Sequence, residues 1–142
     1  MTMTGLRVFD ETLHTTHTWL HEVEARLGLP DRQSAYRLLR AALHTLRDGM
    51  EPNAVAHLSA QLPMLVRGFF YEGWRPAGAP RRRDRETMLE PVARALPPQA
   101  GIDPADALRE VVAVMALHVS AGEMEDLRRT MPEDVRDLLT LG

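Results

Sequence analysis

Several residue types are missing from this chain or nearly so, and each gap excludes a class of protein. Cysteine is absent, which excludes a disulfide scaffold, a thiol nucleophile and a thiolate metal site. Lysine is absent too, since all 17 basic residues are arginine, so neither a lysine Schiff base nor a Walker-type phosphate loop can form. Isoleucine occurs once, at Ile102. This composition, with abundant alanine, leucine and proline, is typical of a GC-rich genome.

Long apolar runs and targeting signals are also missing. The longest apolar block, Val111 to Leu117, falls well short of the ~20 residues that a membrane span needs, and it predicts a buried helix segment. Residues Met1 to Val8 show no basic segment followed by an apolar one, so no secretory signal is expected. We therefore expect a cytoplasmic protein, whose 142 residues suit one compact domain.

The chain contains one apolar pattern twice, in which an apolar-Pro pair follows an apolar residue by four positions and apolar residues then return at helical intervals. The first copy comprises Leu58, Leu62, Pro63, Val66, Phe69 and Phe70, and the second comprises Leu127, Met131, Pro132, Val135, Leu138 and Leu139. The copies are 69 positions apart. Such internal similarity predicts two related helical modules that cover each other's apolar faces.

The spacing of apolar residues predicts helices along both halves of the chain and no strands. We expect a long first helix that ends near Gly28, a second helix capped by Asp31, and a late helix opened by Ser120 and Glu123 as a capping box. The predicted fold is all-α, with about four helices in each module. The modules span residues 1–74 and 86–142, and the basic, proline-containing segment 75–85 links them in one helical bundle.

Several stretches resemble a bacterial family of uncharacterised helical proteins, the domain-of-unknown-function family 2267. The most specific stretch runs from Val66 to Trp74, and further similarity lies in Leu43 to Asp48 and His118 to Glu123. The resemblance covers nearly the whole chain. It implies a helical, duplicated architecture and no assigned activity.

One face of the first predicted helix has the spacing of a metal site. Its polar stripe steps by four, three, four and three positions and comprises Asp10, His14, His17, His21 and Glu24. Two histidines one helical turn apart can share a divalent transition metal, and a carboxylate can add an oxygen ligand. A partly solvated polar face explains the same residues without a metal. Histidines 14 and 17 are not part of the family pattern.

A second candidate region combines aromatic residues with arginines. The predicted interaction surface comprises Arg67, Phe70, Tyr71, Trp74, Arg75, Arg81, Arg82 and Arg83. Exposed aromatics beside arginine are typical of binding hot spots, although the same aromatics could form the hydrophobic contact between the modules. Residues 75–85 have a local charge of +4 and the rest of the chain −7. These arginines could bind phosphates or nucleic acid, or pair with the acidic helices or a second copy.

No catalytic arrangement is found, because Ser59 lacks a nucleophile-elbow setting and His44 and His57 have no nucleophile beside them. We therefore expect a non-enzymatic protein-interaction or regulatory module without a cofactor. Its partner would be another protein or a second copy in a homodimer, and nucleic acid is not expected. The alternatives are a metal- or ligand-binding protein that uses the histidine stripe, and a phosphate binder that uses the basic linker.

Overall fold

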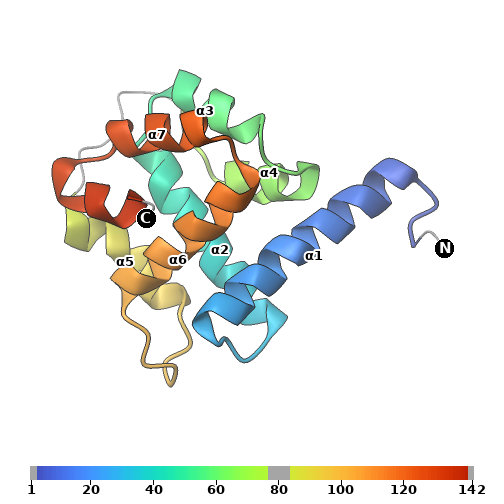
Figure 1. Ribbon diagram of the computed structural model, residues 1–142, viewed down its shortest axis with the longest axis horizontal. Helices are drawn as coiled ribbons and strands as arrows, with labels where there is room; N and C mark the ends of the chain where they lie inside the picture. Colours follow the sequence, from blue (N-terminus) through green and yellow to red (C-terminus); the bar gives the residue numbers. More distant parts are fainter. Residues whose placement is uncertain (1–2, 77–83, 141–142) are drawn as a thin grey trace.

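The computed structural model describes residues 3–76 and 84–140, and these residues form helices with no strand (Figure 1). The predicted all-α class is therefore confirmed. In chain order the elements are α1 (Arg7–Leu27), α2 (Arg32–Asp48), α3 (Pro52–Ser59), α4 (Met64–Tyr71), α5 (Arg85–Ala95), α6 (Pro104–His118), α7 (Ala121–Thr130) and the 3-10 helix η1 (Glu133–Leu139).

The helix ends follow the local signals in the sequence. Helix α1 ends at Gly28, whose positive φ of 63° lets its backbone N–H donate to the Glu24 carbonyl. The side chain of Asp31 accepts from the Ser34 N–H at the start of α2, and Ser120 accepts from the Glu123 N–H at the start of α7. These three predicted ends are confirmed. The last element differs from the expected α-helix, because η1 has the tighter 3-10 geometry of short segments.

Helix α2 lies at the centre of the molecule and packs against α1, α4, α5 and α6 (Figure 1). Its apolar stripe is completely buried at Leu38, Leu39, Leu43 and Leu46. The buried apolar side chains of both halves form one hydrophobic cluster around it. This central position makes α2 the element against which α1 and α4 are placed.

The expected burial of the block from Val111 to Leu117 is only partly correct. Val111, Val112, Val114 and Met115 are buried in α6, but Leu117 is 60% exposed. The helix turns this last residue outward, since α6 faces the core along one side only. Within the described residues, no helix is both long enough and apolar enough to span a membrane.

The first turns of α1 extend beyond the other helices, as Figure 1 shows. No residue between 6 and 13 is buried, and the first buried residue of α1 is Thr16. We call residues 6–13 the α1 arm. From Thr16 onward α1 packs against the body of the molecule.

Candidate functional site

The side chains of the predicted metal stripe have different surroundings along α1. The Asp10 carboxylate accepts hydrogen bonds from the backbone N–H and the hydroxyl of Thr4, at 2.9 and 2.8 Å. His14 and His21 are exposed. In the part of the chain that the structure describes, no three His, Cys, Asp or Glu side chains are grouped to hold a metal ion. The metal site stays a prediction, which metal analysis of the purified protein tests.

Arg32, at the start of α2, bridges two residues of this stripe. Its Nε donates to the Glu24 carboxylate at 2.8 Å, and its Nη1 lies 2.8 Å from Nδ1 of His17. Because a guanidinium can only donate, His17 accepts at Nδ1 and carries its proton on Nε2. A metal bound by His17 would break the hydrogen bond from this guanidinium, because a neutral imidazole has a single acceptor nitrogen.

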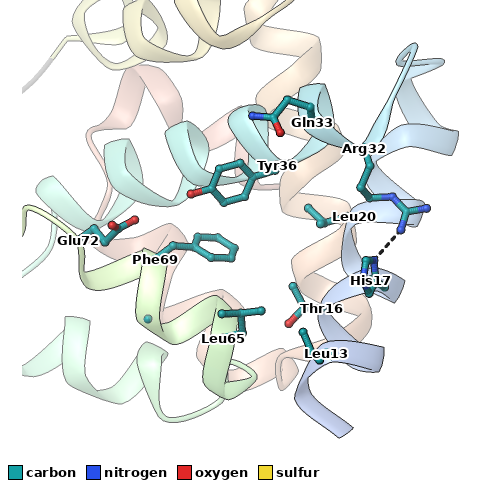
Figure 2. A pocket seen from close by; sticks show the side chains of 11 residues that line it. Leu13, Thr16, His17, Leu20, Arg32, Gln33, Tyr36, Leu65, Phe69 and Glu72 are labelled. Atoms are coloured by element: carbon teal, nitrogen blue, oxygen red, sulfur yellow. Dashed lines mark hydrogen bonds between the residues drawn. The ribbon is translucent and has the colours of Figure 1, made fainter. Parts of the chain in front are cut away.

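A cleft of about 550 Å³ opens between α1, α2 and α4, and we call it the α4 cleft (Figure 2). Figure 2 shows apolar side chains of α1 and α4 on opposite sides of it, with the ring of Tyr36 from α2 next to that of Phe69. Arg32 and His17 lie at one end and Glu72 at the other. The lining residues are Leu13, Thr16, His17, Leu20, Arg32, Gln33, Tyr36, Leu65, Gly68, Phe69 and Glu72.

Two of the lining residues lower the stability of the fold. Gly68 lies inside α4, where a glycine costs about 1 kcal/mol relative to alanine. Thr16 is 5% exposed, and its hydroxyl has no hydrogen-bond partner. An unpaired buried hydroxyl costs roughly 1–3 kcal/mol. Both residues that lower the stability line the same cleft.

The end of α4 is held by two side chains of α2. Arg47 is 4% exposed, and its Nη1 donates to the carbonyls of Phe70 and Glu72, both at 2.8 Å. His44 Nε2 donates to the carbonyl of Phe69 at 2.6 Å. Burial lowers the pKa of His44, although the bond to this carbonyl acts in the opposite direction. These donors bind carbonyls at the end of α4 and just after it, where the regular bonds of a helix stop.

This contact brings together two stretches of the family resemblance, Leu43 to Asp48 and Val66 to Trp74. A family model described as an uncharacterized conserved protein, DUF2267, matches residues 16–138 of the chain. The chain belongs to the DUF2267 family. A comparison with curated proteins finds no match. Membership confirms the resemblance, and because the family is uncharacterised it assigns no activity.

The aromatic run of this DUF2267 chain packs mainly inward. Phe70 is completely buried, so its assignment to an interaction surface is wrong. It faces inward because α4 turns its apolar side toward α2, and its ring meets Tyr71 edge-on at 5.2 Å. Tyr71 and Trp74 are half-buried, and the Tyr71 hydroxyl lies 2.7 Å from that of Ser59.

The arginines of the predicted surface have different surroundings. Arg67 is exposed and donates to the carbonyls of Ser59 and Leu62, so it joins the end of α3 to α4. Arg75 is exposed. The last arginine of the linker, Arg85, begins α5 and donates to the Asp137 carboxylate at 2.7 Å. Arg81, Arg82 and Arg83 lie outside the described residues.

Among the residues that line the α4 cleft, only His17 was singled out as a candidate from the sequence. The sequence did contain a signal for Gly68, because a glycine within a helical pattern lowers the stability of the helix and usually has a role in packing or function. Arg47 left a weaker one, because it falls on the buried side of the apolar stripe of α2. Nothing in the sequence pointed to Thr16 or Arg32, because their contacts depend on which helices pack together.

Proposed function

We propose that this DUF2267 chain is a non-enzymatic protein of two related helical modules, residues 1–74 and 86–142, that acts by association. Equivalent junctions support the two modules. Pro63 and Pro132 precede α4 and η1 with nearly the same backbone angles, φ −55° and ψ 150° or 149°. Arg67 and Arg136, 69 positions apart, each donate at 3.0 Å to the carbonyl of the residue before that proline, Leu62 and Met131.

The packing of the helices also supports this arrangement. If α1, α2, α3 and α4 are exchanged with α5, α6, α7 and η1, most observed contacts map onto observed contacts. The pair α1 and α2 maps onto α5 and α6, and α2 with α4 maps onto α6 with η1. The pair α1 and α6 maps onto α5 and α2, while α2 with α6 and α3 with α7 map onto themselves. Two modules packed about an approximate twofold axis would have this set of contacts.

The observation that carries the role in association is the α1 arm. Leu6, Val8 and Phe9 are 52%, 49% and 44% exposed. The start of α4 lies beside this arm, since the Leu65 N–H donates to the hydroxyl of Thr12 at 3.0 Å. Exposed apolar groups that gather in one region mark interaction surfaces on soluble proteins, and these three lie within four positions of the chain.

We assign a second copy of the chain as the partner of the arm. Leu6, Phe9 and Leu13 are separated by three and four positions, the spacing with which two helices pack along a shared seam. An antiparallel pair of arms uses the same patch on both copies, as a twofold dimer requires. Burying these side chains would stabilise turns of α1 that the body of the molecule does not cover.

Light scattering during size-exclusion chromatography tests this role. The chain is expected to elute as a dimer, and Phe9→Glu to elute as a monomer with unchanged helicity. Leu117→Glu is the matched control, because it places the same charge on an exposed leucine outside the arm, and it should remain dimeric. A wild-type chain that stays monomeric at its highest soluble concentration would contradict the assignment.

A further inference from the structure

The fold does not require the glycine that lines the α4 cleft. Gly68 has no positive φ, and a Cβ added there would meet no atom within 4 Å. Alanine would therefore fit this position and make α4 more stable. The glycine instead leaves space between α4 and α1 open.

The hydroxyl of Thr16 gives a second, independent indication. Its neighbours Thr15 and Thr18 donate to carbonyls one turn back, at 3.0 and 3.1 Å. The Thr16 hydroxyl makes no such bond and is buried. Figure 2 shows it directed toward the cleft, on the side of α4. A polar atom that is buried, unpaired and aimed into a cleft indicates a ligand group that completes its hydrogen bonding.

The polar groups on the α1 side of the cleft are mainly donors. Arg32 donates to Nδ1 of His17, so the free ring nitrogen of His17 carries a hydrogen. At the opposite end, the Glu72 carboxylate is paired with Arg40 at 3.2 Å. An acceptor-rich, negatively charged group therefore fits beside Thr16 and His17.

We propose that the α4 cleft binds a small organic carboxylate with an apolar aryl or alkyl body. The carboxylate accepts from the Thr16 hydroxyl and from the pair of His17 and Arg32. The body packs between Leu65 and Phe69 and fills the space beside Gly68. A cleft of about 550 Å³ lies within the range of small-molecule sites, roughly 300–1,000 Å³. This site goes beyond the proposed association, because the arm shares only Leu13 with the lining of the cleft.

Calorimetric titration of the full chain with phenylpropanoate tests the class of ligand. Phenylpropanol has the same body without the charge, and propanoate has the head without the ring. Saturable binding of phenylpropanoate is expected, with phenylpropanol at least about tenfold weaker and propanoate not detected. Equal binding of acid and alcohol, or no saturable binding of the acid, would overturn the proposal.

Filling the cleft tests its location. Gly68→Leu is expected to abolish the binding of phenylpropanoate while the chain remains folded. The matched control is Gly122→Leu, at a helical glycine of α7 where an added Cβ also meets no atom within 4 Å. It should bind as the wild type does. If the Gly68 variant also binds with wild-type affinity, the proposed location is wrong.

Removing the unpaired hydroxyl separates a binding role from a structural one. Thr16→Val is expected to raise the melting temperature of the free chain by roughly 2–4 °C and to weaken phenylpropanoate binding at least about fivefold. Thr18→Val, which removes a paired hydroxyl outside the cleft, should do neither. A Thr16 variant with unchanged affinity would contradict the role of this hydroxyl.

Discussion

The two proline junctions of the chain have the same construction and different surroundings. At each one an arginine, Arg67 or Arg136, donates to the carbonyl of the residue before the proline. After Pro63 the chain forms the α-helix α4, whereas after Pro132 it forms the 3-10 helix η1. Because the shared part only joins helices, any difference in function must come from the helix after each proline.

The residues 69 positions apart at the two junctions show that difference. Gly68 in α4 lines an open cleft, and the corresponding Asp137 in η1 accepts from Arg85 and Arg109, at 2.7 and 3.5 Å. Ion pairs thus join η1 to α5 and α6, while α4 leaves space beside α1. The first junction therefore leaves room for the proposed ligand, while the second is tied to its neighbours by ion pairs.

The largest effect is expected at Arg47, which holds the end of α4 at the first junction. Arg47→Met removes the hydrogen bonds to the carbonyls of Phe70 and Glu72 and to the Asp48 carboxylate, and it should lower the free energy of unfolding by roughly 3 kcal/mol. Urea denaturation measures this change. Arg37→Met is the control, since Arg37 is exposed on the same helix and should change stability little. A small loss at Arg47 would mean that α4 does not depend on it.

The shared arginines should contribute equally if the two junctions are equivalent. Arg67→Ala and Arg136→Ala each remove two donated hydrogen bonds and should each lower the unfolding free energy by about 1–2 kcal/mol. Parallel denaturation curves compare them. Losses that differ by more than about 1 kcal/mol would argue against equivalent junctions.

The corresponding positions Gly68 and Asp137 should respond in opposite directions to alanine. Gly68→Ala is expected to stabilise the fold by about 0.5–1 kcal/mol, because it relieves the cost of glycine within a helix. Asp137→Ala should destabilise it, because it breaks the ion pairs with Arg85 and Arg109. Thermal unfolding of both variants gives the signs. Destabilisation by Gly68→Ala would show that the fold requires this glycine.

The smallest effect is a difference in pH dependence. Burial lowers the pKa of His44, so its stabilising contribution is complete above about pH 6.5 and is lost as the pH falls through the folded pKa. The hydrogen bond from Arg85 lowers the pKa of Asp137, so that contribution is lost only below about pH 4.

Unfolding of the wild type and of His44→Gln between about pH 7 and pH 5 measures the first contribution. The variant keeps a donor to the Phe69 carbonyl but does not titrate, so its stability should fall less. If the free energy of unfolding changes equally with pH in the two chains, His44 does not contribute to the pH dependence.

Most of the fold could be predicted from the sequence, because its signals are local. The apolar spacing, the caps at Asp31 and Ser120 and the turn at Gly28 each act within a few residues. The exposure of Leu117 could not be predicted, because the sequence of a helix segment that is apolar all round does not show which side packs against the core. The 3-10 form of η1 depends in the same way on its packing.

The candidate site was much less predictable, because it forms between helices. The histidine stripe correctly predicted that His17 and Glu24 share a face, but the partner of both, Arg32, comes from another helix. The sequence left two interpretations of Phe70 open, an interaction surface or the hydrophobic contact between the modules, and only the packing of α4 against α2 shows that it lies in the core. Gly68 has a role only once α1 is known to lie opposite α4.

The central claim is that α4 keeps a cleft open for a ligand at the expense of stability. The affinity of Gly68→Leu for phenylpropanoate, measured beside that of Gly122→Leu, tests it most directly. We predict that the first variant loses binding while it remains folded, and that the second binds as the wild type does. Binding of wild-type strength by the Gly68 variant would contradict the claim.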